Sequence, residues 1–254
     1  MSLSELPLPP KSGGSRALAT TLARAILSGR WASGDAFPRE VDLCEHFAVS
    51  RNRVRNALAE LSSNGLIERT AGRGTVVRPL EEWNLLDPQM SEWMAGLEAP
   101  HPQLVREVFA FRLSAEPFIG ELAALAATGQ DLANIERAFE GMCESATDPA
   151  RRDEHAEHDV AFHDAIYRAS HNLVWRQMGR LLRPSIIALI QRSHDQADSL
   201  ADSLERHRRL LDAIRLRQPE AAREATERVL ARTAADLGLD PGGRKVRRPA
   251  ALTS

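Results

Sequence analysis

The chain has 254 residues, of which 43% are hydrophobic and 5% aromatic, and 33 Lys and Arg against 35 Asp and Glu give a net charge of −2. This length allows two domains, and the composition is typical of a helical globular protein. No run of about 18 apolar residues occurs, which excludes a membrane span. Cys44 and Cys143 lie far apart without metal-binding spacing. We therefore expect two reduced, buried thiols and a cytoplasmic protein.

The charge is divided unevenly between the two parts of the chain. Residues 1–80 hold 11 Lys and Arg against 7 Asp and Glu, a net +4, whereas the remainder carries a net −6. A positive domain attracts a phosphate backbone and a negative one repels it. Only the first part is therefore suited to bind nucleic acid.

Residues 1–14 are expected to form a flexible lead, which lacks the apolar core of a signal peptide. A helix is predicted over residues 15–28. Apolar residues at helical spacing predict the inner side of this helix. They are Leu18, Leu22, Ala25 and Ile26. A second, short helix follows with an apolar side expected at Val41, Leu43, Cys44 and Phe47, and Ala48-Val49 forms a tight corner.

The next helix begins after Ser50, whose side-chain oxygen can cap it. Its inward positions, at helical spacing, are Val54, Ala57, Leu58 and Leu61. The exposed positions are Arg51, Asn52, Arg53, Arg55 and Asn56. Arginine and asparagine pair bidentately with the edges of guanine and adenine in a major groove. This pattern predicts a DNA recognition helix.

A β-hairpin is predicted to follow, with strands at 66–69 and 75–77 and a turn at Gly72-Arg73-Gly74. A helix-turn-helix followed by a hairpin with arginine at its tip is typical of a winged helix. The alternative is an ordinary helical hairpin whose charged face is only solvated. Several agreeing signals favour the winged helix.

These residues resemble the winged-helix domain of the GntR family of bacterial transcription regulators. The matching motifs are Gly34, Phe37-Pro38-Arg39-Glu40, Val49-Ser50-Arg51, Arg55-Asn56-Ala57-Leu58, Leu61, Gly65-Leu66 and Gly72-Arg73-Gly74-Thr75. Phe37, Arg39 and Val41 depart from the family pattern, Val41 standing where many members carry an arginine. The DNA-binding candidates are Arg39, Ser50, Arg51, Asn52, Arg53, Arg55, Arg73 and Gly74. The predicted DNA-binding domain spans residues 15–80.

Residues 81–100 are predicted to form a connector helix that packs against its neighbours. Trp83, Leu85, Leu86, Trp93 and Met94 supply the apolar side chains. Exposure of two tryptophans would be costly, which favours a packed connector over a free linker.

The part from 101 to 239 is expected to be entirely helical. Apolar residues spaced three and four positions apart predict helices at 104–127, 131–146, 150–169, 173–196, 198–217 and 220–237. Residue pairs that disfavour helix separate these segments. This favours an antiparallel bundle and a mainly α protein. The basic tail over 240–254 is expected to be disordered.

Three segments of this helical part resemble the FCD subfamily of GntR regulators. They are FRLSAEPFIGELAALAAT, HDVAFHDAIYRASHN and ERHRRLLDAIRLRQPEAAREA. The resemblance implies an effector-binding and dimerisation domain. The WNLLDP connector and the Glu116-Pro117 pair resemble regulators of sugar-acid catabolism in particular.

Asp159 and His163 are four residues apart and project from one face of a helix. His207 is in step with apolar residues, so it faces inward, where a lone histidine is usually a hydrogen-bonded core residue. The family resemblance implies that all three are ligands of a divalent metal, zinc or similar. The family's last histidine is missing, because Val229 stands near its position. Three interpretations remain: a weaker site completed by water or effector oxygens, substitution by His194 or Asp195, or no metal.

Arg112 matches the arginine that binds the effector carboxylate in the family. A guanidinium in a partly dry pocket would pair bidentately with such a carboxylate. The alternative is a surface ion pair with Glu116, four residues along the helix.

The sequence predicts a homodimeric transcription regulator, a repressor, that binds double-stranded operator DNA and senses a small carboxylate, and no enzymatic activity. Two other classes compete. One is a metal-dependent hydrolase using Asp159, His163 and His207, for which no convincing general base or nucleophile motif is found. The other is an architectural DNA-binding protein without an effector.

Overall fold

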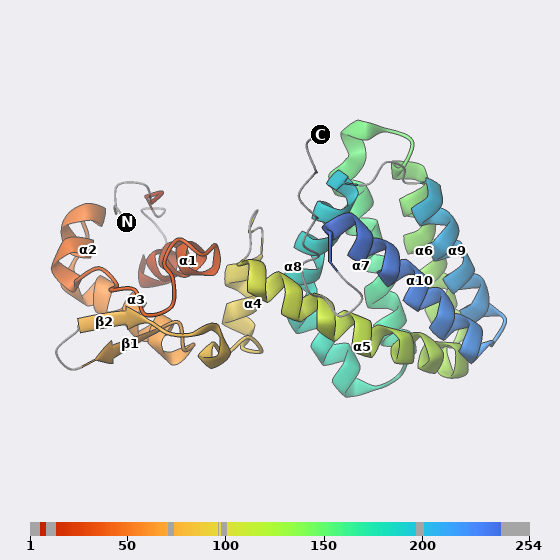
Figure 1. Cartoon of the computed structure of the whole chain (residues 1–254), viewed down its shortest axis with the longest axis horizontal. Helices are drawn as coiled ribbons and strands as arrows, with labels where there is room; N and C mark the ends of the chain where they lie inside the picture. The colour runs from red at the N-terminus through yellow and green to blue at the C-terminus, as the bar shows by residue number, and fades with distance from the viewer. Residues whose placement is uncertain are drawn as a thin grey trace, which may run out of the picture. The chain divides into compact units, whose positions relative to one another are not determined.

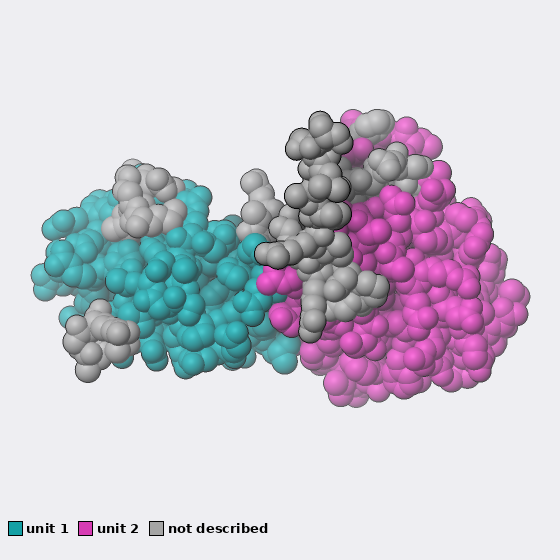
Figure 2. All heavy atoms as spheres, viewed as in Figure 1, with its two compact units in different colours: residues 1–104 teal, residues 105–254 magenta. Residues whose placement is uncertain are grey.

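The computed structural model describes residues 6–8, 14–70, 74–95, 97, 101–196 and 201–239, with the side chains of 70, 149, 185, 188 and 191–196 left out. The chain divides into two compact units, Met1–Leu104 and Val105–Ser254 (Figure 2). Most of the lead expected over 1–14 and the tail expected over 240–254 lie outside the described residues. Among the described residues, no helix is long and apolar enough to cross a membrane.

Unit 1 contains the predicted winged helix. Its elements in Figure 1 are α1 (Gly14–Leu27), α2 (Glu40–Phe47), α3 (Arg51–Ser63), β1 (Ile67–Thr70), β2 (Gly74–Val77), the 3₁₀ turn η3 (Leu80–Glu82) and α4 (Pro88–Met94). Helices α1 and α2 both pack against α3, and α1 also contacts α4. All four predicted inward residues of α3 are buried.

The structure corrects the predicted inner side of α2. Leu43 and Phe47 are buried, but Val41 is 46% exposed, and Cys44, like Cys143 in the other unit, is only partly buried. Residues two apart do not share a helix face, so Val41 cannot point inward together with Leu43. The corner between α2 and α3 is formed by Ala48 in the left-handed conformation, with φ of 51°.

The hairpin pairs β1 and β2 antiparallel, with Ile67 opposite Val77 and Arg69 opposite Thr75. A third segment, which precedes α2, lies beside β2. Ala36 forms a bridge with Val76, and the amide of Phe37 donates to the carbonyl of Thr75. The bridge adds a partner to β2, so the wing is anchored to the segment that leads into α2.

The connector is not the single helix predicted over 81–100. It consists of η3 and the short α4. Asp87 caps α4 and Pro88 occupies its first turn. Proline is tolerated at the start of a helix but not in its interior, so a new helix begins here. Trp83 and Trp93 are buried as expected for a packed segment, whereas Leu86 is 48% exposed.

Unit 2 is helical throughout its described residues. The chain enters it in α5 (Pro102–Ala126) and continues through α6 (Gly129–Ser145), the 3₁₀ turn η4 (Pro149–Arg151), α7 (Arg152–Ala169), α8 (Leu173–Gln196), α9 (Ala201–Arg215) and α10 (Pro219–Leu237). The six predicted helices are confirmed, with ends shifted by a few residues.

The helices of unit 2 enclose one core. The contacts α6 with α7, α7 with α8, α8 with α10, α10 with α9 and α9 with α6 close a ring of five helices. Helix α5 adds Ala115, Ile119 and Ala123 to the core. A Cβ at Gly120 would lie 2.6 Å from Oγ1 of Thr226, so glycine allows α5 to approach α10 closely. This packing brings side chains of α5, α7 and α9 together.

Gly65 is expected to be essential for the stability of unit 1. Its φ is +75°, and an added Cβ would lie 2.3 Å from the backbone oxygen of Glu82. Gly34 is a matched control, since its φ is +81° but no atom lies within 4 Å of the Cβ position. Alanine in a left-handed conformation costs about 1–2 kcal/mol at either site. The backbone clash should make Gly65→Ala worse than Gly34→Ala by about 2 kcal/mol in denaturant unfolding. Equal losses would contradict the close approach.

Candidate DNA interface and buried sensor site

The exposed side of α3 presents the polar residues predicted to face DNA. Arg51, Asn52, Arg55 and Asn56 are exposed, while the opposite side is buried in the core of unit 1. The Oγ of Ser50 accepts from the amide of Arg53 and caps the helix, as predicted. The N-terminal residues of a recognition helix are the ones that contact base edges. This surface has the composition and location that such contacts require.

The other DNA-binding candidates differ in what they contact. The guanidinium of Arg39 donates to both carboxylate oxygens of Asp42, at 2.9 and 2.8 Å. Nε of Arg53 donates to the carbonyl of Gly14, at 2.8 Å, so this side chain also contacts the start of α1. Gly74 is exposed at the start of β2 with φ of +80°. Arg73 lies outside the described residues.

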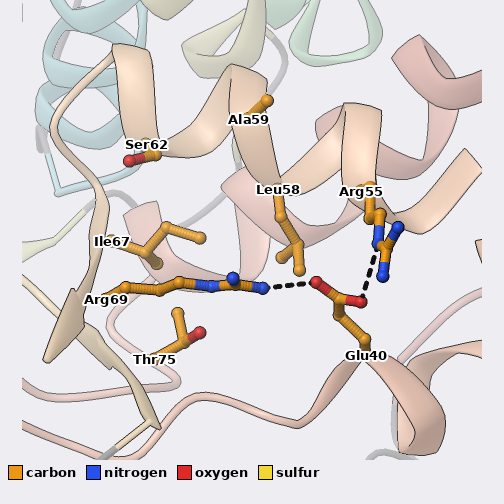
Figure 3. A pocket seen from close by; sticks show the side chains of 8 residues that line it. All are labelled: Glu40, Arg55, Leu58, Ala59, Ser62, Ile67, Arg69 and Thr75. Atoms are coloured by element: carbon orange, nitrogen blue, oxygen red, sulfur yellow. Dashed lines mark hydrogen bonds and ion pairs between the residues drawn. The ribbon is translucent and has the colours of Figure 1, made fainter. Parts of the chain in front are cut away.

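Nε of Arg55 contacts Glu40, at 3.1 Å, and Arg69 of β1 contacts the other oxygen of the same carboxylate, at 2.5 Å. These side chains line a pocket of about 370 Å³ between α2, α3 and the hairpin (Figure 3). Neither Glu40 nor Arg69 was among the candidates from sequence. Hydrogen bonds between residues 15 and 29 positions apart leave no local sequence signal.

The three predicted metal ligands meet in the interior of unit 2. Asp159 and His163 of α7 and His207 of α9 are 3%, 5% and 3% exposed, and one potential donor atom of each lies within 4.8 Å of the others. Oδ1 of Asp159 is 3.4 Å from Nε2 of His163 and 3.8 Å from Nε2 of His207. The sequence predicted this set, and the fold brings it together.

The contacts of the two Nδ1 atoms orient the histidine rings. Nδ1 of His163 lies 3.2 Å from Oε2 of Glu116, and Nδ1 of His207 lies 2.8 Å from the carbonyl oxygen of Ser203. A carboxylate and a carbonyl only accept, so each Nδ1 donates a proton to its partner. Both Nε2 atoms face Asp159, and each would offer its lone pair to a metal bound there. A carboxylate or carbonyl on the second nitrogen is the usual support of a metal-binding histidine.

Arg112 is 1% exposed and lies beside this cluster. Its Nε and Nη2 donate to the carboxylate of Glu116, at 2.7 and 3.2 Å, and Nη2 is 3.5 Å from Nε2 of His163. The ion pair with Glu116 therefore exists, but it is buried rather than on the surface. Within the described part of the chain, Nη1 of Arg112 has no hydrogen-bond partner.

The electrostatics keep this ion pair charged. Burial alone would raise the pKa of Glu116, but Arg112 and His163 outweigh it and lower the pKa to about 2. Burial likewise lowers the pKa of Arg112, but the surrounding acidic groups, Glu116 first and Asp159 among the others, together outweigh burial and raise this pKa. Burial and Glu116 both raise the pKa of Tyr167, whose hydroxyl remains protonated and lies 3.4 Å from Oε1 of Glu116.

From sequence, Glu116 was expected as a surface partner of Arg112 and as part of the Glu116-Pro117 pair, and Tyr167 was not among the candidates. A signal for Tyr167 was present, because it continues the four-residue steps of Asp159 and His163 along α7. Ser203 offers only its backbone carbonyl to His207, which no residue pattern predicts.

The donors present fit a divalent ion. Two imidazoles, which bind a metal in their neutral form, and one carboxylate are ligands that zinc and similar metals accept, and three protein donors leave further positions for other oxygens. Val229 is buried and apolar, so it supplies no donor. The side chains of His194 and Asp195, the suggested substitutes, lie outside the described residues.

Comparison with known proteins matches both units to families. Residues 15–77 match "Bacterial regulatory proteins, gntR family", and residues 107–232 match the FCD domain. The galactonate operon transcriptional repressor of Escherichia coli K12 is 34% identical over 214 residues, 83% of this chain and 91% of the repressor. The Glc operon transcriptional activator of the same organism is 28% identical over 214 residues, 82% of each chain.

A solved structure of Lar, which controls expression of the Listeria monocytogenes agr system, shares the fold. Its TM-score is 0.59 with 14% identity, covering 89% of this chain and 97% of Lar. The winged helix, the helical bundle and these matches define a DNA-binding transcription regulator. The chain belongs to the GntR family and carries an FCD domain. The family and these relatives are regulators and not enzymes, so the hydrolase interpretation is not supported.

Proposed function

We propose that this regulator is a homodimeric repressor whose bundle binds a small carboxylate and thereby changes the affinity of two winged helices for an operator. The observation that carries the proposal is the position of Arg112. Its Nη2 lies 3.5 Å from Nε2 of His163, one of three potential metal donors, and its buried Nη1 has no hydrogen-bond partner among the described residues. A buried, unsatisfied guanidinium nitrogen is costly, so an acceptor from a ligand would stabilise it.

The carboxylate ligand follows from the charge and the donors of this site. Glu116 already occupies Nε and Nη2 of Arg112, which leaves Nη1 for the effector. A metal ion held by Asp159, His163 and His207 would supply a Lewis-acid centre for effector oxygens. Sugar acids carry a carboxylate, which suits Arg112, and neighbouring hydroxyls, which suit a metal ion. The similarity to the galactonate operon repressor supports this ligand class and repression rather than activation.

The homodimer follows from the size of one recognition helix. A single α3 contacts too few bases for useful specificity, whereas two related by a twofold axis recognise a palindrome. The effector shifts operator occupancy only through its different affinities for the DNA-competent and DNA-incompetent states. The effector must therefore bind more tightly to the state that releases DNA.

Substitution of Arg112 tests the effector site. We expect Arg112→Ala to abolish effector-triggered release from DNA while DNA binding is retained, because the carboxylate loses its donor. Arg112→Lys retains a charge beside Glu116 but loses the fork of donors, and it controls for misfolding. A DNA-shift assay with galactonate and other sugar acids and hydroxy acids measures release, and thermal stabilisation measures binding. Unchanged release by both variants would refute the role of Arg112.

Removal of one donor tests the metal site. Loss of a supporting partner of a metal ligand costs about 10–100-fold in affinity, so His207→Ala should weaken Zn²⁺ binding by at least about 100-fold. His171→Ala is the control, because His171 is half exposed and contacts Asp131 outside the cluster. Calorimetric titration of metal-free protein with Zn²⁺, with metal analysis of untreated protein, gives the comparison. The metal proposal fails if wild-type protein binds no Zn²⁺ or both variants bind like wild type.

Arg51→Ala tests recognition by α3. It should weaken binding to the operator more than binding to random-sequence DNA, by about 5- to 100-fold, as expected for loss of a bidentate base contact. The operator is obtained by selection from a pool of random duplexes with wild-type protein. An equal loss on both kinds of DNA would mean that Arg51 contacts only phosphates.

A further inference from the structure

One carboxylate joins three elements on the side of unit 1 that carries the recognition helix. Oε2 of Glu40 accepts from Nε of Arg55, at 3.1 Å, and Oε1 accepts from Nη2 of Arg69, at 2.5 Å. Figure 3 shows the carboxylate between the two guanidinium groups, with Arg55 coming from α3 and Arg69 from the hairpin. The carboxylate therefore links the recognition helix directly to the wing.

The three side chains differ in how firmly they are held. The side chain of Glu40 is 21% exposed, whereas those of Arg55 and Arg69 are 61% and 79% exposed. Glu40 is the first residue of α2, where a negative charge is favoured by the helix dipole. The carboxylate is thus the more fixed member, and it limits the orientations of two arginines that would otherwise move freely in solvent.

The geometry leaves Arg55 able to contact a base. Its contact with Glu40 uses Nε. The terminal Nη1 and Nη2 carry the hydrogens that pair end-on with O6 and N7 of guanine. Holding a long side chain in one orientation before DNA arrives reduces the conformational entropy lost on binding. The benefit applies only where a base edge is in the matching position, so it increases specificity rather than general affinity.

The negative charge of Glu40 also favours specific over nonspecific DNA binding. Neutralising phosphates with arginine supplies most of the affinity for random-sequence DNA. A carboxylate that engages two arginines lowers this attraction, because phosphate must compete with it. Glu40 would thus weaken nonspecific binding while strengthening the contact with the correct base.

We infer that Glu40 is a positioning residue for DNA recognition, which orients Arg55 toward a base edge and couples it to the wing through Arg69. This inference rests on the proposed contact of α3 with bases. The competing explanation is an ordinary surface ion-pair network, which contributes little to stability and nothing to specificity.

Two substitutions of Glu40 separate its geometry from its charge. Glu40→Asp keeps the charge but is one methylene too short to hold both arginines in the same geometry. Glu40→Gln keeps the length and removes the charge. Glu45→Gln removes an exposed charge from the same helix, outside the three-residue network, and serves as the matched control. Each protein is tested as the full chain, with thermal unfolding recorded to show that the fold is retained.

The measurement is the ratio of affinities for a duplex selected by the wild-type chain and for a scrambled duplex of the same composition. We expect Glu40→Asp to lower this ratio by about tenfold. Complete loss of a bidentate base contact at both half-sites would lower the ratio further. Glu40→Gln should lower it similarly and also raise affinity for the scrambled duplex, with a steeper dependence on salt. Glu45→Gln should leave the ratio within about twofold of wild type.

Arg55→Ala distinguishes the ways in which this inference can fail. If Arg55→Ala lowers the ratio but Glu40→Asp and Glu40→Gln do not, Glu40 does not position Arg55, although α3 still contacts bases. If Arg55→Ala leaves the ratio unchanged, the proposed base contact of Arg55 is itself wrong, and the role of Glu40 falls with it. A loss that matches a fall in melting temperature and is equal on both duplexes indicates a structural role only.

Discussion

The arrangement of unit 2 depends on one buried carboxylate. Glu116 is 2% exposed and receives hydrogen bonds from Arg112 on its own helix and contacts from His163 and Tyr167 of α7. A charge taken out of water is stable only where partners compensate for the lost hydration. Because these partners come from two helices, the requirement to satisfy Glu116 sets how α5 and α7 face each other. The same contact turns Nδ1 of His163 toward Glu116, so that Nε2 faces Asp159. The ion pair is thus a structural element and the support of the candidate metal site.

Glu116 and Glu40 illustrate the same chemistry in two environments. Each accepts from side chains of two elements, but Glu116 is enclosed, whereas the arginines on Glu40 are more than half exposed. In the interior, breaking the pair leaves an uncompensated charge and is strongly unfavourable. In solvent, the pair is weak and can exchange for phosphate or a base. The buried network therefore suits a rigid site, and the exposed one suits recognition.

Several features were predictable from sequence because they depend on neighbouring residues. The inward residues of α3, the Ser50 cap and the six helices of the bundle follow from periodicity and capping, which act within one or two turns. The errors arose where the pattern was short or interrupted. Val41 was assigned to a helix face that it cannot share with Leu43, and Pro88 divides the connector. The bridge between Ala36 and Val76 joins residues 40 positions apart and has no local signal.

The sequence by itself determined the elements and the pairs within one helix. The exposed polar side of α3 and the four-residue spacing of Asp159 and His163 are properties of a single helix, whatever surrounds it. The family resemblance also pointed to His207, but only the tertiary structure brings His207 of α9 to that pair, places Glu116 and Ser203 at the two Nδ1 atoms, and buries Arg112 beside them. Arg112 and His163 are 51 residues apart, and their contact depends on how helices pack. Packing is set by the shapes of many side chains together, which no local pattern contains.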